Sequence, residues 1–289
     1  MKIEEKQNQE AFLTLLYAQR YYYNKARMPL RFRAIINILL PVSSVISILW
    51  FPSLKMPLAI FGAVWLIISQ LILQERAKHF TKLAATIQEE FDTRLFDIKW
   101  NKVLIGEKVK PDIIFDAVSN FRKGRDKLRD WYTGLNCDSL YLNTLLAQRT
   151  NLIWDQNLRK RYATFLFRIT WSAFIFLIIL GIIWKMSVED LLLTIVIPSL
   201  SAFVYGIQNA RSHKQHAIKS KKTESYITAS FEQSRNHSDH NNFQLLREYQ
   251  NQIFLKRSEP LIIPKWYYWI HQKKDNEKMK KVNEFMQQL

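Results

Sequence analysis

The sequence predicts an all-α integral membrane protein, with four transmembrane helices in two hairpins and a split, mostly helical cytoplasmic domain. Four long runs carry no charged residue: Ala34–Phe51, Met56–Leu73, Ile169–Trp184 and Leu191–Ala210. A bilayer core about 30 Å thick is crossed by about 20 apolar residues in a helix. A large soluble α-domain with buried helices fits less well, because surface helices keep a polar face and these runs are paired across short turns.

The placement of Lys and Arg predicts the orientation of the spans. Basic residues crowd the outer flanks of both pairs: Arg20, Lys25, Arg27, Arg31 and Arg33 before the first run, Arg76, Lys78 and Lys82 after the second, Arg159, Lys160, Arg161 and Arg168 before the third, and Arg211, Lys214, Lys219, Lys221 and Lys222 after the fourth. The two short turns between paired runs carry only Lys55 and Lys185. Positive charge near a span stays on the cytoplasmic side. We therefore expect both termini in the cytoplasm.

The spans divide the chain into five parts. We expect an N-terminal cytoplasmic amphipathic helix in 1–33, a first transmembrane hairpin in 34–73, a cytoplasmic helical sensor region in 74–162, a second hairpin in 163–210 and a C-terminal cytoplasmic helical region in 211–289. The mean hydropathy of -0.17 agrees with much mass outside the bilayer.

Periodicity predicts further elements outside the spans. Helices are expected over Gln9–Arg27, from span two on to Phe91, over Ile113–Tyr132 and Leu140–Tyr162, over 211–236 as a continuation of span four, around Phe243–Ile253, and over Glu277–Gln288. Leu95–Ile105 is expected to be a short extended segment, and Lys185–Asp190 the turn of the second hairpin.

The sequence lacks the motifs of the common catalytic sites. It contains no phosphate-binding glycine loop, no nucleophile elbow and no zinc-protease motif, and it has six glycines in all. Cys137 is the single cysteine, so no disulfide forms within one chain. The carboxylates Glu89, Glu90, Asp92 and Asp97 could in principle serve acid–base chemistry, but helix capping and surface charge are the preferred interpretation. We predict no enzyme activity and no cofactor.

Two histidine pairs are candidate metal ligands. His213 and His216, and likewise His237 and His240, are three residues apart, a spacing that could share a metal on a helix. No third ligand is fixed by the sequence, and both pairs lie in polar stretches. A solvated surface is the preferred interpretation, and no metal site is predicted.

Span four carries a polar stripe. Thr194, Pro198, Ser201, Tyr205 and Gln208 fall on one helix face, and span one repeats the pattern more briefly at Asn37, Pro41 and Ser44. Small and polar residues on one face are typical of helix–helix packing, and they can also line a water path. Both interpretations hold if the packing is between subunits. A single bundle of four helices closes on its own side chains, so a pore requires a ring of copies. The candidate pore-lining residues are Thr194, Ser201, Tyr205, Gln208, Asn37 and Ser44.

The cytoplasmic segments mix basic and aromatic residues densely, and the net charge is +17. Arg and Lys pair with phosphates and aromatic planes stack on bases, so this composition suits a nucleotide pocket. Ordinary core aromatics with lipid-facing charge explain any single patch as well, and the run Lys265–Trp269 also suits an interfacial anchor. The candidate ligand-binding residues are Arg20, Tyr23, Lys25, Arg149, Asn151, Trp154 and Arg159.

Short motifs around the four spans carry a resemblance. They are Gln7-Asn8, Leu15–Arg20, Tyr23–Ala26, Phe91-Asp92, Trp100-Asn101, Asp130–Tyr132, Gln148–Asp155 closed by Leu158-Arg159, Gln250–Ile253 and Pro264–Trp266. In this order, over almost the full length, the chain resembles the SMODS-associated four-transmembrane effectors of bacterial anti-phage systems.

The resemblance implies a function. Such effectors are thought to form pores in the bacterial inner membrane, beside a nucleotidyltransferase that makes a nucleotide second messenger, cyclic or linear. The resemblance implies a homo-oligomer, with a tetramer as a guess, that opens on infection and arrests growth or kills the cell. The signal could open the pore or hold it shut. A non-conducting membrane-anchored scaffold that recruits a partner through its basic surface is the alternative. A small transporter is disfavoured, because the spans lack a buried carboxylate.

Overall fold

The computed structural model describes residues 3–122, 124–236, 242–264, 266–268, 270–271, 275, 277, 281–282 and 285. The elements are the helices α1 (Ile3–Lys6), α2 (Glu10–Trp50), α3 (Lys55–Ile68), α4 (Gln74–Phe96), α5 (Lys102–Ile105), α6 (Pro111–Asn120), α7 (Leu140–Ile183), α8 (Val188–Leu191), α9 (Ile197–Asn236) and α10 (Phe243–Arg257), the 3₁₀ turns η1 (Pro52–Leu54) and η3 (Asp126–Leu128), and the π-helical turns η2 (Ser69–Leu73) and η4 (Leu192–Val196). No strand occurs in these residues, which confirms the all-α fold.

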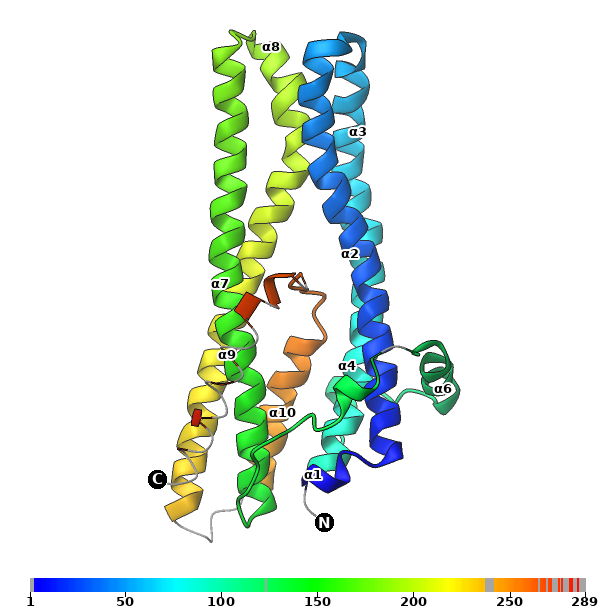
Figure 1. Ribbon diagram of the computed structural model, residues 1–289, viewed down its shortest axis with the longest axis vertical. Helices are drawn as coiled ribbons and strands as arrows, with labels where there is room; N and C mark the ends of the chain where they lie inside the picture. Colours follow the sequence, from blue (N-terminus) through cyan, green and yellow to red (C-terminus); the bar gives the residue numbers. More distant parts are fainter. Residues whose placement is uncertain are drawn as a thin grey trace. The chain divides into compact units, whose positions relative to one another are not determined.

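The chain forms two compact units (Figure 1). The head unit comprises Met1–Ala26, Lys78–Arg159 and His216–Leu289, and the span unit comprises Arg27–Ala77 and Lys160–Gln215. The long helices α2, α4, α7 and α9 each contribute residues to both units.

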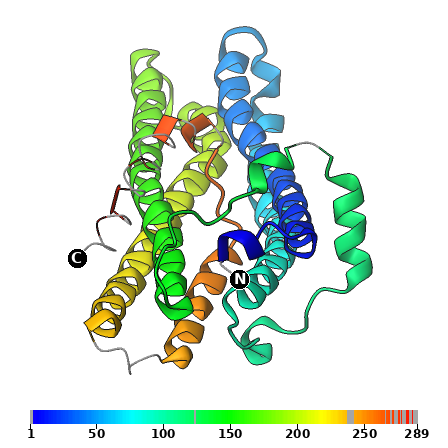
Figure 2. The ribbon, with the colours of Figure 1, turned by 60° about the horizontal axis from the view of Figure 1, so that its bottom comes forward.

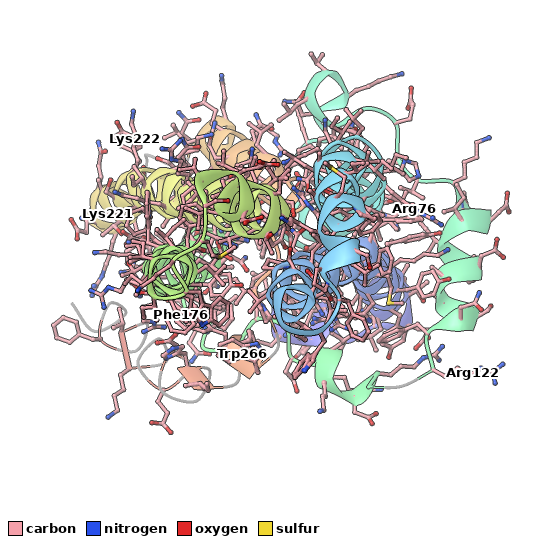
Figure 3. All side chains as sticks on the ribbon, turned by 90° about the horizontal axis from the view of Figure 1, so that it is seen from above. Arg76, Arg122, Phe176, Lys221, Lys222 and Trp266 are labelled. Atoms are coloured by element: carbon pink, nitrogen blue, oxygen red, sulfur yellow. The ribbon has the colours of Figure 1, made fainter. Side chains whose placement is uncertain are left out.

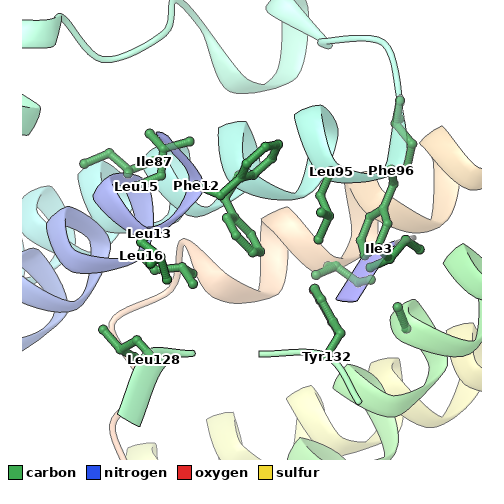
Figure 4. Close-up of a cluster of buried hydrophobic side chains, with 14 of the residues drawn as sticks. Ile3, Phe12, Leu13, Leu15, Leu16, Ile87, Leu95, Phe96, Leu128 and Tyr132 are labelled. Atoms are coloured by element: carbon green, nitrogen blue, oxygen red, sulfur yellow. The ribbon is translucent and has the colours of Figure 1, made fainter. Parts of the chain in front are cut away.

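The head unit is built around an apolar core between α1, the first part of α2, α4 and the first part of α7 (Figure 4). Leu16 and Phe91 are fully buried there, and the ring of Phe12 packs edge-on against Phe91 with centroids 5.9 Å apart. The irregular segment after α6 closes the core with Leu128 and Tyr132. In Figure 2 this segment passes along α1 and the start of α2. Burial of each large apolar side chain contributes about 1.5–3 kcal/mol, so the core is sufficient to hold these discontinuous segments together.

The span unit carries its apolar side chains on the outside. All four predicted spans lie in helices that are long and apolar enough to cross a membrane. Ile38, Leu71, Phe176 and Ile182 are each more than half exposed. Buried side chains include polar ones, such as Asn37. Apolar side chains outside and polar side chains inside are the reverse of the arrangement in a water-soluble protein, and they suit a hydrocarbon solvent. The chain is therefore a multi-pass membrane protein.

Glycines allow the helices of the span unit to pack at short distances from one another. A Cβ atom added at Gly62 of α3 would lie 3.1 Å from the Cα atom of Pro198 in α9. One added at Gly206 of α9 would lie 2.2 Å from the Oγ1 atom of Thr170 in α7. Small residues allow such close approach, which is a main source of helix association in membranes.

Several expected elements are confirmed and others are wrong. The helices at Leu140–Tyr162, 211–236 and Phe243–Ile253 are present, as is the continuation of span two. Leu95–Ile105 is not extended: Asp97, with a positive φ of 56°, ends α4, and the Asn101 side chain caps α5 by accepting from the Leu104 N–H. The turn of the second hairpin is shorter than expected, because Ser187 caps α8.

The expected helix over Ile113–Tyr132 stops at Asn120. The backbone of Phe121 is extended, with φ −101° and ψ 90°, and its buried side chain joins the core. Gly124, with φ 80°, prevents the helix from resuming at once. The expected terminal helix Glu277–Gln288 lies for the most part outside the described residues.

Candidate functional site

Basic and aromatic residues predicted as ligand-binding meet inside the head unit. The hydroxyl group of Tyr23, on α2, interacts electrostatically with Arg20, with Arg159 of α7 and with Arg257 of α10. The guanidinium of Arg20 lies over the ring of Trp131, 5.7 Å from its centroid. Segments far apart in the sequence therefore place several cations around one tyrosine.

Lys256 joins this group through a shared carboxylate. Asp155 of α7 accepts from the Arg159 Nε at 2.6 Å and lies 3.1 Å from the Lys256 Nζ. Asp92 of α4 pairs with Arg257. We call Arg20, Arg159, Lys256 and Arg257 the cationic cluster. Its four cations face three carboxylates, the buried one of Asp92, the partly buried one of Asp155 and the half-exposed one of Glu259, so a surplus of positive charge remains that an anion could neutralise.

Burial makes the electrostatics of the cationic cluster strong. Desolvation raises the pKa of Tyr23 to about 12, and it lowers the pKa values of Arg20 and Lys256. Burial alone would raise the pKa of Asp155, but the charges of Arg159 and Lys256 outweigh it and lower that pKa well below its usual range. Charges in such a setting are screened little by salt.

Aromatic rings lie beside the cationic cluster. The ring of Trp154, on α7, packs against Tyr268 with centroids 5.0 Å apart, and Tyr268 interacts electrostatically with Arg20. Tyr23 donates its hydroxyl proton to Gln88 at 3.1 Å. Cations flanked by aromatic planes are the chemistry that a phosphorylated base needs.

A buried polar network supports the cluster from α4. Asp92 accepts from the Tyr132 hydroxyl at 2.8 Å and from Gln250 at 3.1 Å, and Asn151 donates to the same hydroxyl at 2.9 Å. Glu89 accepts from Arg247 at 2.6 Å. Burial is the largest influence on Glu89 and raises its pKa.

The surface interpretation is wrong for Glu89, Glu90 and Asp92, whereas Asp97 is exposed as expected. Glu89 and Asp92 are fully buried and Glu90 nearly so. The cations that pair with Glu89 and Asp92 lie on α10, far along the chain from α4, so no local pattern could pair them.

Two predicted ligand residues lie apart from the cluster. Arg149 precedes Arg159 by ten residues of α7, roughly 15 Å along the axis. It pairs with Glu224 at 3.1 Å and donates to Thr228 at 3.0 Å, while its NH1 group is buried without a partner. Lys25 is exposed, and its Nζ lies 5.2 Å from the centroid of the Phe80 ring.

Sequence reasoning missed Asp92, Lys256, Arg257 and Tyr268 as members of this region. The one available signal was the Lys256-Arg257 doublet, two residues after the buried Phe254 of α10. Basic residues in the last turn of a helix are usually explained by their favourable interaction with the helix dipole. Their position alone therefore does not indicate that they also belong to a binding site.

The motifs behind the resemblance also meet in the head unit. Gln7 donates to the Tyr132 carbonyl at 2.9 Å and accepts from its N–H at 2.8 Å. Gln148 donates to Gln250 at 3.1 Å, and Asn101 donates to Asn251 at 3.2 Å. These side chains join segments that are distant in the sequence, which assigns the motifs a positioning role around the cluster.

The solvated interpretation of the first histidine pair is also wrong. His213 is fully buried and packs edge-on against Tyr162, and His216 is buried and pairs with Glu259. Among the described residues no group of three metal-ligating side chains occurs. His237 and His240 lie outside the described residues.

The predicted polar stripe lies mostly inside the span unit. Thr194, Ser201, Asn37 and Ser44 are each at most 2 % exposed. The π-helical turn η4 includes Thr194, whose carbonyl accepts from the Ser44 hydroxyl of α2. Such turns break the regular ladder and release backbone carbonyls for other donors.

Part of this stripe has no hydrogen-bond partner. Asn37 accepts from the Trp65 indole at 2.8 Å, but its amide nitrogen is buried and unpartnered, as is the Ser201 hydroxyl. An unpartnered buried polar group costs about 1–3 kcal/mol. We call the four buried residues of the stripe, Asn37, Ser44, Thr194 and Ser201, the polar seam, because they are polar side chains buried within an apolar unit.

Two further stripe residues, Tyr205 and Gln208, lie nearer the basic flank. The guanidinium of Arg33 lies 4.6 Å from the centroid of the Tyr205 ring, and Gln208 is exposed and accepts from Gln70 at 2.8 Å. Arg33 also donates to Gln74 at 2.9 Å. The stripe thus grades from buried Thr194 to exposed Gln208.

Comparisons with known proteins agree with this architecture. No solved structure matches the chain. A protein of Bacillus cereus strain VD146, described as a probable CBASS effector molecule, is 36% identical over 287 residues, which cover 96% of each chain. Residues 1–286 match the family described as the SMODS-associating 4TM effector domain. Because the match covers nearly the whole chain, the protein belongs to the family of SMODS-associating 4TM effectors.

Proposed function

We propose that this protein is an anti-phage effector of the bacterial inner membrane that forms a pore under the control of a nucleotide second messenger. Its family and its similarity to a probable CBASS effector molecule support the defence role. A paired nucleotidyltransferase would supply the messenger, and infection would change its level. Opening of the pore would arrest growth or kill the cell.

The observation that carries the proposal is the cationic cluster. Its surplus positive charge and flanking aromatic rings suit the phosphates and bases of an oligonucleotide. Arg20 and Tyr23 lie on α2, and Asn151, Trp154 and Arg159 lie on α7. Both helices continue into predicted spans, so a ligand that changes their spacing acts directly on the membrane segments. Arg149 and Lys25 remain candidates for contacts at the edge of the site.

The polar seam supports the conducting half of the proposal. Asn37, Ser44, Thr194 and Ser201 are buried among helices whose outer faces are apolar, as a shut state of the proposed pore would require. Opening would turn these residues, with Tyr205 and Gln208, toward water at the centre of a ring of copies. Hydration would then satisfy the Asn37 and Ser201 groups that lack a partner, which lowers the free energy of the open state.

The sign of control follows from which state the messenger prefers. A ligand shifts an equilibrium only by its difference in affinity for the two states. Bridging α2 and α7 through the cluster either holds them as they are, which keeps the pore shut, or draws them to a new spacing, which opens it.

The test is leakage from dye-loaded liposomes that contain the purified protein, with and without cyclic and linear oligonucleotides. We expect at least one oligonucleotide to switch leakage on or off. Arg20→Met should weaken that response roughly 10- to 100-fold, because one charge-assisted hydrogen bond contributes about 1.5–3 kcal/mol. Arg122→Met, at an exposed position outside the cluster, is the matched control.

A second variant tests the seam separately. Ser201→Ala removes a buried hydroxyl that has no partner, so stability should be unchanged or higher. Ion flux through the open pore should fall, because the seam loses a group that water would contact. Flux equal to wild type would refute the seam as the pore lining. No leakage under any condition, with inserted and folded protein, would favour the non-conducting scaffold.

A further inference from the structure

The head unit exposes an acidic helix face on α6. Asp112, Phe115, Asp116 and Ser119 follow one another at spacings of three, one and three residues and are all exposed, with Phe115 at 63%. The helix contains two aspartates and no basic residue, in a chain of net charge +17. Its other side is fixed in the head unit, because Ile114 and Ala117 are buried. We call these four residues the acidic face.

The acidic face is not paired with a cation of its own chain. Within the described part of the chain, neither Asp112 nor Asp116 forms an ion pair, although Lys108 and Lys102 nearby pair with Glu90 and Glu107. Isolated exposed apolar residues are ordinary, but Phe115, next to Asp116 in an unmatched acidic pair, resembles the apolar core and charged rim of an interface.

The head unit also exposes a basic face on α9. Ile218, Lys221, Lys222, Ser225 and Tyr226 are exposed, and their spacing of three and four residues places them on one side of the helix. Ile218 is 60% and Tyr226 53% exposed, with the two lysines between them. Neither lysine forms an ion pair in the described residues. We call these five residues the basic face.

Lipid does not account for the basic face. Lys222 follows the last residue of span four, Ala210, by twelve residues of the same helix, roughly 18 Å of rise. The headgroup layer takes up about 5–7 Å of that rise, so a charge at this height on a straight helix is more than one Debye length, about 8–10 Å, beyond the headgroups, and its attraction to lipid is weakened by screening.

The two faces lie on opposite sides of the head unit. In Figure 1, α6 projects from one side, while the part of α9 that belongs to this unit lies on the other. The view in Figure 3 agrees: Lys221 and Lys222 lie at one edge, and Arg122, just after α6, lies at the other. One chain cannot bring the two faces together, whereas two chains can.

We propose that a second copy of this chain is the partner: the acidic face of one copy docks on the basic face of the next. The charges are complementary, and Phe115 would pack on Ile218 and Tyr226 between the charged pairs. Different surfaces meet in such a contact, so each copy keeps one free face for another copy. A heterologous contact of this kind closes into a ring when its rotation allows.

This contact supplies the subunit interface of the proposed ring, and its role in conduction rests on the proposed function. Two short helix faces bury less than a standard interface of about 1,600 Å², so the contact is weak by itself. Confinement of the copies to one membrane raises their effective concentration, which allows a weak contact to assemble a ring.

Cross-linking in membranes tests the contact directly. Ser119→Cys and Ser225→Cys place one thiol on each face without altering a charge, and Cys137→Ser removes the native thiol. The two variants, with different tags, are co-expressed, and membranes are treated with a short bismaleimide. We expect the mixed dimer of the two variants and little dimer of either variant alone. Glu248→Cys, exposed on α10, replaces Ser225→Cys in the control pair.

Charge reversal on the two faces provides a second test of the contact. Lys221→Glu with Lys222→Glu on the Ser225→Cys chain should lower the mixed dimer roughly fivefold, because two opposed ion pairs become repulsive. Asp112→Lys with Asp116→Lys on the Ser119→Cys chain should restore it. A mixed dimer no stronger than in the control pair, or one that is unaffected by reversal, would overturn the proposal and indicate another partner for these faces.

The two proposals fail in different ways. Leakage that the nucleotide controls, without the mixed dimer, would leave the pore standing and remove this interface. A charge-dependent mixed dimer in a protein that never conducts would leave the interface standing and remove the pore.

Discussion

Asp92 shows how one buried residue ties the head unit together. Its carboxylate, 0 % exposed, accepts from Arg257, Tyr132 and Gln250, which lie on α10 and on the segment before α7. Removing one member of a buried ion pair leaves the other charge uncompensated. The stability of the head unit should therefore depend on this residue more than on any exposed charge.

Arg257→Met should lower the free energy of unfolding by about 3–5 kcal/mol, because Asp92 then remains buried without its cation. Thermal unfolding of the detergent-solubilised protein measures the change. Asp92→Asn in the same chain should recover part of the loss, since it removes the stranded charge. Arg122→Met, at an exposed position, should change stability by less than about 0.5 kcal/mol. Equal losses for Arg257→Met and Arg122→Met would contradict this account.

The phenol of Tyr23 predicts a pH dependence. Burial favours the neutral form and raises the pKa from 10 to about 12. Because the pKa is higher in the folded state than in the unfolded state, Tyr23 contributes to the free energy of unfolding. This contribution is fully present below pH 10 and is lost as the pH rises to 12. Across that window the wild type should lose about 2–3 kcal/mol that Tyr23→Phe does not lose. Chemical denaturation of both proteins across this pH window checks the difference. A stability difference that stays constant over the range would refute it.

At the scale of elements, the close packing of α7 and α9 in the span unit rests on Gly206. An added Cβ would lie 2.2 Å from the Thr170 Oγ1 atom and 2.8 Å from its Cγ2 atom, and both atoms belong to a short side chain with little freedom to move away. The two helices can therefore keep their spacing only while this position has no side chain.

Gly206→Ala should destabilise the span unit by about 1–3 kcal/mol, the usual cost of overpacking. Thr170→Ala removes the two closest atoms, so the double variant should recover most of the loss. Ala202→Val, one turn earlier at a half-buried position, is a control for added volume on α9. Thermal unfolding in detergent compares the four proteins. No rescue in the double variant would show that the contact with Thr170 does not determine the spacing.

The elements also show where sequence reasoning succeeds. Long charge-free runs predicted all four spans, because hydrocarbon tolerates no unpaired polar group and leaves few alternatives. Helices next to the spans were predicted correctly because they continue the same period. The segment 121–139 was not, because its packing depends on Leu128 and Tyr132 reaching a core formed by other parts of the chain.

The candidate site was predictable only in part. Arg20, Tyr23 and Arg159 stood out as basic and aromatic neighbours along the chain, and the structure brings them together. Glu89 and Asp92 looked like surface charges, because their partners on α10 come only near the other end of the chain. The polar stripe gave no sign of whether water or protein covers it, because packing and pore lining demand the same small residues.

For the whole molecule, the basic flanks predict that the two hairpin turns face away from the cytoplasm. Val188→Cys, at the start of α8, and Ser53→Cys, in η1, lie at exposed positions where the two hairpins reverse, and Ser225→Cys lies exposed on α9 of the head unit. Each is introduced with Cys137→Ser. A membrane-impermeant maleimide applied to spheroplasts should label the first two at once and Ser225→Cys only after permeabilisation, because positive charge near a span resists translocation. Labelling of Ser225→Cys in intact spheroplasts would place the cationic cluster outside the cell, where no cytoplasmic nucleotidyltransferase could supply its ligand. The same labelling therefore checks the orientation and the physical access on which nucleotide control depends.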